Sequence, residues 1–223
     1  LAYPNNPTGA VMEKADLEKL VPIVKKHNLI VFSDEIYGEL SYNGLKFTSI
    51  ASFDGMRERT IVISGFSKYF AMTGWRLGYV CAPKEIIDVI YKIHQYAIMC
   101  ASTAAQYVAL EALNSSFKDN FKEVHTMRDE YDKRRRYLVD RLNAMGLSCF
   151  EPRGAFYVFP CVKSTGMDGE KFAYALLDAK NVAVVPGGAF GDSGKDFVRI
   201  SYAYSMDIIK RALDLIEEFL NNK

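Results

Sequence analysis

The sequence predicts an α/β protein, with a mainly parallel sheet in a larger N-terminal domain and a smaller C-terminal α+β domain. In the first half, short apolar runs rich in β-branched residues alternate with segments of helical periodicity, a pattern typical of parallel sheets. In the second half, short strand-like runs and two helical segments follow a long charged stretch. We place the boundary after residue 115, so that the expected domains span 1–115 and 116–223.

Two of the strands predicted in the first half end in polar sequence. A helix is expected over 13–26, where apolar residues recur at helical spacing despite Pro22. The runs 29–32 and 60–63 predict buried parallel strands, and 77–81 predicts a third strand of the same kind. Ligands bind beyond the carboxyl ends of such strands, so the polar residues that follow them are candidates for a site.

The rest of the chain predicts further helices and two or three more strands. A long charged helix is expected over 117–144, where acids and bases four residues apart, such as Glu130 and Arg134, indicate an exposed face. The basic run 133–136 therefore indicates a solvated surface rather than a nucleic-acid patch. Helices are expected between 84 and 113, at 170–180 and at 206–221, and strands at 155–159, 182–185 and 197–201.

Composition and charge exclude several classes of function. The chain has 223 residues and a formal net charge of +1, which favours neither nucleic acid nor an anionic membrane as a partner. No apolar run approaches the ~18–20 residues that span a bilayer. The four cysteines and three histidines are scattered, without the spacing of a metal site or a disulfide scaffold. We therefore expect a metal-free protein of the reducing cytoplasm.

A lysine and an arginine follow the second predicted strand, in the stretch SGFSKYFAMTGWRLGY at 64–79. Lys68 could simply extend its amine to solvent, the commoner role of a lysine after a strand. Its surroundings argue otherwise, because Lys68 and Arg76 stand in a long pattern of glycine, serine and aromatic residues with little freedom. This stretch resembles the cofactor-lysine signature of class I/II pyridoxal-phosphate aminotransferases of fold type I, in their aspartate/aromatic aminotransferase-like branch.

Four other stretches resemble the same family and occur in the family's order. They are NNPTG at 5–9, SDEIY at 33–37, PRGAFY at 152–157 and FVRIS at 197–201. Each alone is a weak signal, since NNPTG is also simply a good turn. Together with 64–79 they extend over essentially the whole chain, which corresponds to about the C-terminal half of a family member.

The resemblance implies a site for pyridoxal 5′-phosphate. Lys68 matches the residue that holds the cofactor's aldehyde as a Schiff base and whose freed amine then moves a proton at the substrate's α-carbon. Asp34 matches the carboxylate that keeps the pyridine nitrogen protonated, and Arg76 matches the guanidinium that binds the phosphate. Tyr37 and Asn6 match the hydrogen-bond donors to the phenolate oxygen.

Two further positions concern the substrate and the phosphate. Arg199 matches the arginine that binds the substrate's α-carboxylate as a bidentate pair, and Asn6 is expected on the substrate side as well. The position three before the lysine, often a serine that contacts the phosphate, is Gly65 here. We expect the hydroxyl of Ser64 to replace it.

Each of these residues also has an ordinary alternative role. Asp34 could cap a helix, Tyr37 could belong to the core, and Arg199 could form an ordinary ion pair. The ordered set of motifs favours the functional roles, because the alternatives do not explain why the motifs occur together.

The glycine-rich stretch GGAFGDSGK at 187–195 also invites a functional interpretation. A phosphate-binding GxxxxGK[ST] loop is excluded, because Ala189 stands where glycine is needed and Asp196 replaces the Ser/Thr. We expect a loop that leads into the strand at 197–201. No GxGxxG and no GxSxG occurs in the chain, which argues against a dinucleotide enzyme and a common serine hydrolase.

The expected activity is transfer of an amino group from an L-amino acid to a 2-oxo acid, by a homodimer when the protein is intact. A carbon–sulfur β-lyase with the same cofactor and a non-catalytic, effector-sensing aminotransferase-like domain remain as alternatives. The family's N-terminal portion, which completes the pocket, would precede the 5–9 loop. We therefore expect this chain alone not to turn over.

Overall fold

The computed structural model describes residues 1–222 and divides into two compact units. Unit 1 comprises Leu1–Pro4 and Val11–Arg128, and unit 2 comprises Asn5–Ala10 and residues 129–222. The division falls after Arg128, whereas the sequence placed a domain boundary after residue 115. Residues beyond 115 pack in unit 1: the ring of Phe121, for instance, lies 6.5 Å from that of Phe70.

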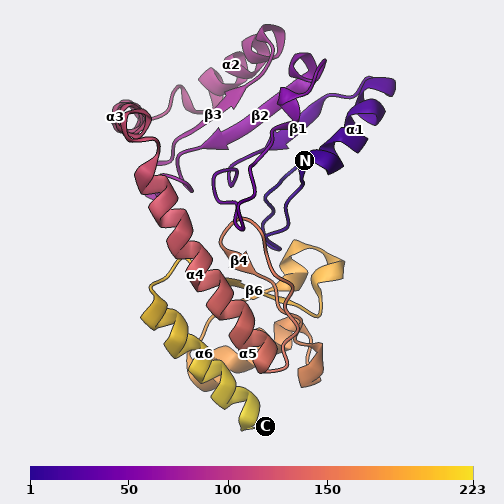
Figure 1. Cartoon of the computed structure of the whole chain (residues 1–223), viewed down its shortest axis with the longest axis vertical. Coiled ribbons are helices and arrows are strands. Elements are labelled where there is room, and N and C mark those ends of the chain that lie inside the picture. Colours follow the sequence, from indigo (N-terminus) through magenta and orange to yellow (C-terminus); the bar gives the residue numbers. More distant parts are fainter. Residues whose placement is uncertain (223) are drawn as a thin grey trace. The chain divides into compact units, whose positions relative to one another are not determined.

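Unit 1 contains a three-stranded sheet in the order β1-β2-β3, in which β1 (Val31–Asp34) pairs in parallel with β2 (Thr60–Gly65) (Figure 1). In this register Asp34 lies beside Ile63, so the two carboxyl ends meet at one edge of the sheet. The parallel pairing of the first two predicted strands is therefore confirmed. The polar residues that follow β1 and β2 emerge together.

The third strand, β3 (Gly78–Cys81), runs antiparallel to β2. The expectation that 77–81 forms another parallel strand is wrong in direction. A parallel return needs a crossover connection of a dozen or more residues, which usually contains an α-helix. The connection from β2 to β3 contains only the 3₁₀ turn Thr73–Trp75, so the chain reverses instead of crossing over.

Helices of unit 1 follow the predicted order. Helix α1 (Lys14–Lys26) presents Leu17, Val21 and Val24 on one face, and these pack with Val31 of β1 in a buried cluster. This spacing of three and four residues is the apolar stripe of a helix that covers a sheet. The other helices that begin in unit 1 are α2 (Lys84–Ile98), α3 (Thr103–Asp119) and α4 (Lys122–Ala144), which continues into unit 2.

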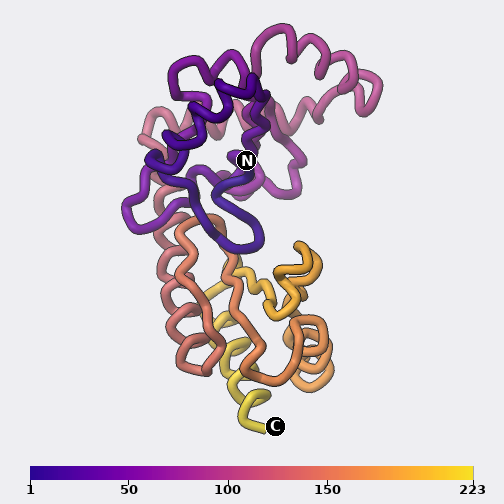
Figure 2. The backbone as a smooth tube through the Cα atoms, turned by 90° about the vertical axis from the view of Figure 1, so that its right-hand side faces the viewer, coloured from indigo at the N-terminus to yellow at the C-terminus, as the bar shows by residue number. Residues whose placement is uncertain are grey.

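Helix α2 has no buried residue, and Figure 2 shows it, in magenta, extending away from the other elements of unit 1. Several of its large apolar side chains are exposed, with Tyr96 94% accessible. Exposed apolar surfaces of this kind are typical of interaction sites. Among residues 1–222, none of the helices combines the length and the apolarity needed to cross a membrane.

Unit 2 contains a second small sheet, entirely antiparallel, in the order β4-β6-β5. Its strands are β4 (Tyr157–Val158), β5 (Val185–Pro186) and β6 (Val198–Ser201), and its helices are α5 (Gly169–Lys180) and α6 (Met206–Asn221). The strands β4 and β6 lie within the predicted ranges 155–159 and 197–201, whereas β5 shares only Val185 with the strand predicted at 182–185. Short 3₁₀ turns complete the chain at Ile50–Ser52, Arg57–Arg59, Lys163–Thr165, Gly187–Phe190 and Asp192–Gly194.

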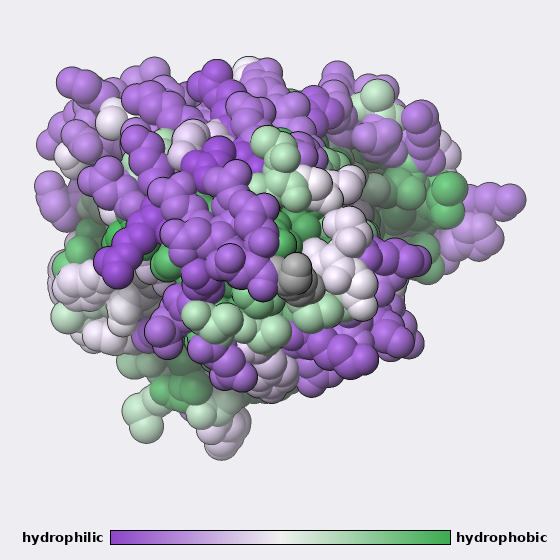
Figure 3. All heavy atoms as spheres, turned by 90° about the horizontal axis from the view of Figure 1, so that it is seen from below, coloured by the Kyte–Doolittle hydropathy of each residue, from purple (hydrophilic) through white to green (hydrophobic). Residues whose placement is uncertain are grey.

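Polar and apolar side chains of the protein separate as in ordinary globular domains. The face in Figure 3 is mostly hydrophilic, with hydrophobic side chains in separate patches. In unit 2, buried residues such as Leu138 and Leu142 of α4, Leu176 of α5 and Leu213 of α6 form the interior. The α+β character expected for the C-terminal part follows from this packing of helices around a small antiparallel sheet.

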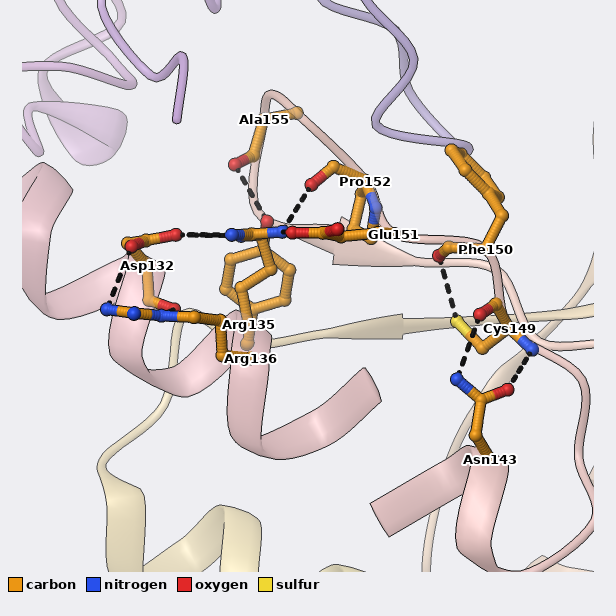
Figure 4. Close-up of polar contacts among 10 residues, drawn as sticks. Asp132, Arg135, Arg136, Asn143, Cys149, Phe150, Glu151, Pro152 and Ala155 are labelled. Carbon is orange, nitrogen blue, oxygen red and sulfur yellow. Dashed lines mark hydrogen bonds and ion pairs between the residues drawn. The ribbon is translucent and has the colours of Figure 1, made fainter. Parts of the chain in front are cut away.

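Arg135 of α4 is fully buried, at 0% exposure. Its Nε donates to Asp132 Oδ1 at 2.8 Å, and its Nη1 donates to Glu151 Oε1 at 2.6 Å and to the carbonyl of Pro152 at 3.0 Å (Figure 4). The expectation of a solvated basic face is therefore wrong for this residue. Arg135 lies three residues before Leu138, on the buried stripe of the helix, and the two carboxylates compensate its charge.

Replacing Arg135 by methionine is expected to lower the free energy of unfolding by about 2–3 kcal/mol. The substitution keeps the aliphatic volume but leaves Asp132 and Glu151 without the cation between them. Both carboxylates retain some access to water, at 20% and 55% side-chain exposure, which limits the loss. Urea unfolding followed by circular dichroism measures it.

Arg136→Met is the matched control on the same helix. Arg136 pairs with the same Asp132 at 3.0 Å, but its own side chain is 61% exposed. An exposed pair contributes less than ~1 kcal/mol. Equal losses for the two methionine variants would contradict the assignment of Arg135 as a buried anchor.

Candidate active site

Lys68 lies in a turn that directly follows β2. The turn is closed by backbone hydrogen bonds from Met72 N–H to the carbonyl of Phe66, at 3.2 Å, and from Ala71 N–H to that of Lys68, at 3.4 Å. Phe66 N–H also donates to the carbonyl of Leu77, which ties the turn to the start of β3. These bonds fix the backbone that carries the amine.

Aromatic rings pack around this turn. The ring of Phe66 lies 5.6 Å from that of Phe70 and 5.9 Å from that of Tyr79, and the ring of Tyr69 lies 4.9 Å from that of Phe70. The hydroxyls of Tyr69 and Tyr79 are 3.3 Å apart, and burial together with this neighbour raises the pKa of Tyr69. The residues on either side of Lys68 are thus anchored in apolar packing, while Lys68 itself is only half-buried.

The segment from Asp34 to Tyr37 forms a second turn, at the end of β1. Asp34 Oδ1 accepts a hydrogen bond from Ile36 N–H at 3.1 Å, and Glu35 N–H donates to the carbonyl of Ile63 at 2.8 Å. Asp34 therefore has a local structural role, but it caps a turn and not a helix, because residues 36–39 form a turn. Its second carboxylate oxygen is not used in that hydrogen bond.

Glu35 holds this turn from the other side. Its Oε1 accepts hydrogen bonds from Ser49 Oγ at 2.6 Å and from Ser33 Oγ at 2.9 Å. Burial raises the pKa of Glu35, and the two serine hydrogen bonds offset part of that effect. Glu35 thus connects the end of β1 to Ser49. The turn from Asp34 to Tyr37 is held by these side-chain bonds of Glu35 and by the bond from Ile36 N–H to Asp34.

The two turns bring an amine and a phenol together. The Nζ of Lys68 lies 5.6 Å from the centre of the Tyr37 ring. Tyr37 is buried, so its ring belongs to the core as the alternative interpretation held. Because Asp34 is three residues from Tyr37 and begins the same turn, a carboxylate, a phenol and an amine occupy the ends of adjacent parallel strands.

Ser64 and Gly65 occupy the last two positions of β2. Ser64 is buried and its Oγ donates to the carbonyl of Glu35 at 3.4 Å. A Cβ at position 65 would lie 2.9 Å from both Gly78 Cα and the carbonyl oxygen of Leu77. The close approach of β3 therefore explains why glycine stands where the related pattern often has serine.

Arg76 is exposed and begins the return toward β3. Its backbone is left-handed, at φ 52°, and its Nη1 donates to the carbonyl of Thr73 at 2.9 Å. This bond uses one of the guanidinium's five N–H groups. The other four have no partner among residues 1–222, so the guanidinium is able to bind an anion.

Asn6 and Arg199 belong to unit 2 and contact each other. The Nη1 of Arg199 donates to Asn6 Oδ1 at 2.9 Å, across 193 positions of sequence. The bond leaves the amide group of Asn6 able to donate, as its expected role requires. The interpretation of Arg199 as half of an ordinary ion pair finds no acid partner within residues 1–222.

The loop that carries Asn6 is held in place through Gly9. The carbonyl of Gly9 accepts hydrogen bonds from the N–H groups of Arg153 and Gly154, both at 2.9 Å. A Cβ on Gly9 would lie 2.3 Å from Pro152 Cβ and 2.8 Å from the carbonyl oxygen of Gly154. The motifs at 5–9 and 152–157 are therefore two halves of one contact, which explains why they occur together.

Gly9→Ala is expected to lower the free energy of unfolding by about 2–4 kcal/mol. The methyl group would meet Pro152 and Gly154, and the backbone at φ +70° already disfavours a side chain. Gly44→Ala is the matched control, because Gly44 has φ +71° with nothing within 4 Å of an added Cβ. It should show only the backbone strain, about 1 kcal/mol. Similar losses for both variants, measured by urea unfolding, would overturn the close contact at Gly9.

The predicted residues thus form two groups. Unit 1 contains Asp34, Tyr37, Ser64, Lys68 and Arg76, with Lys68 against Tyr37. Unit 2 contains Asn6 and Arg199, which are hydrogen-bonded. The first group has the chemistry of a cofactor site, and the second has that of a carboxylate site.

Comparison with known proteins identifies the family of this chain. The family model described as aminotransferase class I and II matches residues 1–216. The chain belongs to the aminotransferase class I and II family. It is 48% identical to an aspartate aminotransferase of Pyrococcus abyssi and 45% identical to aromatic-amino-acid aminotransferase 2 of Thermococcus litoralis, over 99% of its own length in each case. It superimposes with a TM-score of 0.95 on the crystal structure of an aromatic aminotransferase from Pyrococcus horikoshii, at 48% identity, covering 99% of this chain and 58% of that one.

This class I and II aminotransferase chain spans just over half the length of these relatives. It covers 56% of both the Pyrococcus abyssi and the Thermococcus litoralis proteins. Fold type I, expected from the motifs, is confirmed by the solved structures that it matches.

Family members depend on pyridoxal 5′-phosphate, and the donor set of unit 1 fits that cofactor. The molecule carries an aldehyde, a pyridine nitrogen, a phenolate and a phosphate, and each needs a different partner. Lys68 offers the amine for the aldehyde, Asp34 an anion for the pyridinium, and Tyr37 a hydroxyl for the phenolate. Arg76 and Ser64 offer a guanidinium and a hydroxyl for the phosphate.

Sequence reasoning did not single out two residues that contact or support the candidate site, Glu35 and Tyr157. Glu35 was part of a recognised motif, but its bonds to Ser33 and Ser49 depend on a serine 14 positions away. Tyr157 was also inside a recognised motif, and its ring lies 4.5 Å from the guanidinium carbon of Arg199. An aromatic residue in the 152–157 stretch was the available signal, although nothing in the sequence connects it to Arg199.

Proposed function

We propose that the intact protein containing this chain is an aminotransferase that moves an amino group from an L-amino acid to a 2-oxo acid. The observation that carries the proposal is the position of the Lys68 amine against Tyr37, beside the Asp34 turn, at the ends of two parallel strands. Membership of the aminotransferase class I and II family supports it. The relatives' names include both aspartate and aromatic aminotransferases, so the proposal stops at the class of L-amino acids.

Each residue has a defined part in this proposal. When bound, pyridoxal 5′-phosphate withdraws electrons from the bond between the substrate's α-carbon and its hydrogen. Lys68 holds the aldehyde carbon and then, with its amine freed, takes and returns the proton at the α-carbon. The Asp34 carboxylate keeps the ring nitrogen protonated, and Tyr37 donates to the phenolate oxygen.

The remaining residues bind and orient. Arg76 and Ser64 hold the phosphate, which keeps the cofactor in place between the two half-reactions. Arg199 binds the α-carboxylate through its unused N–H groups, and Asn6 fixes one side of that guanidinium and also donates to the phenolate. Bidentate binding of the carboxylate selects α-amino acids and 2-oxo acids over simple amines and ketones.

Transfer of ¹⁵N from a labelled L-amino acid to 2-oxoglutarate tests the proposal. The intact protein is incubated with pyridoxal 5′-phosphate, 2-oxoglutarate and a panel of ¹⁵N-amino acids that includes aspartate, alanine and the aromatic residues. Mass spectrometry should find ¹⁵N-glutamate, formed only when both substrates are present. Release of pyruvate and ammonia from cystathionine without an oxo acid would identify a carbon–sulfur β-lyase instead. Binding of amino acids without any product would identify an effector-sensing domain.

We propose that the intact protein is a homodimer. The exposed apolar side chains of α2, among them Ile93, Tyr96 and Ile98, support this because exposed apolar surfaces of this kind mark contacts with a partner. Light scattering coupled to size exclusion should give twice the mass of one chain.

We also propose a cytoplasmic location, supported by four cysteines that form no disulfide. Cell fractionation tests it.

A further inference from the structure

The glycine-rich stretch before β6 has no part in the function described so far. It folds into two consecutive 3₁₀ turns, Gly187–Phe190 and Asp192–Gly194. A Cβ on Gly187 would lie 2.3 Å from the carbonyl oxygen of Gly194, and a Cβ on Gly194 would lie 2.2 Å from that of Gly187. Gly187 N–H also donates to the carbonyl of Phe197 at 2.8 Å. The two ends of the loop are thus in contact, and neither position has room for a side chain.

This closed loop places the ring of Phe190 against Arg199. The guanidinium carbon of Arg199 lies 4.9 Å from the centre of the Phe190 ring and 4.5 Å from that of Tyr157. Both distances are within the range of a cation–π contact, which attracts a cation to the face of an aromatic ring. Arg199 is therefore in contact with two rings from different parts of unit 2.

Phe190 is itself supported by an aromatic neighbour. Its ring meets that of Phe159 edge-on at 6.2 Å, and Phe159 is stacked on Phe197 at 5.1 Å with the planes only 3° apart. Phe159 is buried, whereas Phe190 is 39% exposed. Phe159, stacked on Phe197, thus supports the Phe190 ring, while the face of that ring is directed at the guanidinium.

These contacts restrict Arg199 in two ways. Asn6 accepts from Nη1 at 2.9 Å, which limits rotation of the side chain, and the two rings limit the tilt of the guanidinium plane. An arginine binds a carboxylate by two parallel N–H bonds only when its plane matches that of the carboxylate. A guanidinium already held in one plane loses less rotamer entropy on binding.

We propose that Phe190 is a positioning residue, which holds the plane of the Arg199 guanidinium for a carboxylate. The inference rests on the proposed function, since it takes Arg199 to bind the carboxylate of the substrate. The ligand class is any acid with a planar carboxylate. The glycine-rich stretch 187–195, excluded as a phosphate loop, is the structural element that presents this ring.

Three small probes separate this role from general stability. Propionate has the carboxylate without the amine, ethylamine has the amine without the carboxylate, and L-alanine has both. In the intact, cofactor-loaded protein, Phe190→Leu should raise the Kd of propionate and the KM of L-alanine about threefold to tenfold. Calorimetric titration gives the Kd, and cofactor absorbance follows the amines. The kcat with L-alanine and the rate constant with ethylamine should stay within about twofold of the original protein.

Two comparison variants accompany the leucine variant. Phe190→Tyr keeps the aromatic face and should restore the propionate Kd. Phe150→Leu makes the same chemical change at another exposed phenylalanine of unit 2, 50% accessible, and should leave all three probes unchanged. An unchanged propionate Kd in Phe190→Leu, or an equal loss with ethylamine, would overturn the proposal.

A fluorinated series keeps the test decisive if the leucine variant fails to fold. Introducing mono-, di- and trifluorophenylalanine at position 190 weakens the negative face of the ring in steps while keeping its shape. The propionate Kd should rise with each fluorine, and a flat series would refute the positioning role. Absence of ¹⁵N transfer in the unmodified protein would reject the proposed function alone, because propionate binding is measured without turnover.

Discussion

Replacing Lys68 by alanine in the intact protein is expected to lower kcat/KM for amino-group transfer by ~10³-fold or more. The variant loses both the amine that holds the cofactor's aldehyde and the base that moves the proton at the α-carbon. The turn itself should survive, because it is closed by backbone bonds and by the packing of Phe66, not by the amine. Transfer of ¹⁵N under single-turnover conditions measures the remaining rate.

Two further variants make the Lys68 result specific. Lys68→Arg keeps the positive charge beside Tyr37 but has no usable amine, and should be nearly as inactive as the alanine variant. Lys84→Ala removes an exposed lysine that pairs with Asp88 at the start of α2, and should keep the original rate. If Lys68→Ala retained more than a tenth of the activity, the assignment of Lys68 would be wrong.

Asp34→Asn is expected to lower kcat/KM by ~10²–10³-fold with little change in stability. Asparagine keeps an oxygen that accepts the Ile36 N–H bond, so the turn after β1 should be preserved. It removes the negative charge, however, and a protonated pyridine nitrogen then loses its stabilising partner. Steady-state kinetics and urea unfolding on the same sample measure the two effects separately.

Asp34→Ala separates the two roles of this carboxylate. It removes the turn hydrogen bond as well as the charge, so it should add a stability loss of about 1 kcal/mol to the kinetic defect. An aspartate that served only as a turn former would show the opposite pattern, with full activity in Asp34→Asn. That outcome would show that the Asp34 carboxylate is not needed to keep the cofactor's pyridine nitrogen protonated, and the assignment of Asp34 would be wrong.

The sequence predicted β1, β2 and the residues at their ends because those features are local. An apolar run followed by Asp34 or by Ser64 is visible in a few residues, and parallel pairing then brings the two ends together. The direction of β3 was not predictable in the same way. The apolar composition of 77–81 suits either direction, and the decisive feature is that the preceding connection contains a 3₁₀ turn and no α-helix.

Arg135 and Arg199 show why the rest escaped sequence reasoning. Arg135 lies in a run of four basic residues, and its burial depends on Glu151, 16 positions later, which neither periodicity nor spacing indicates. The role of Arg199 was suggested by its motif. Its partners Asn6 and Phe190 come from a loop 193 positions away and from a glycine-rich stretch that had another candidate interpretation. Contacts that join distant segments are set by packing, and one sequence alone does not show them.

The position of Asn5–Ala10 in unit 2 has a consequence for how this protein can be divided. The chain leaves unit 1 after Pro4, returns at Val11 and leaves again after Arg128. Residues 129–222 are therefore not a module that a gene could duplicate or exchange as one block. A block of this kind would lack the segment Asn5–Ala10. In that segment Gly9 packs against Pro152, and Asn6 accepts the hydrogen bond from Arg199. Recombination that preserves the carboxylate site has to carry two separate pieces of coding sequence together.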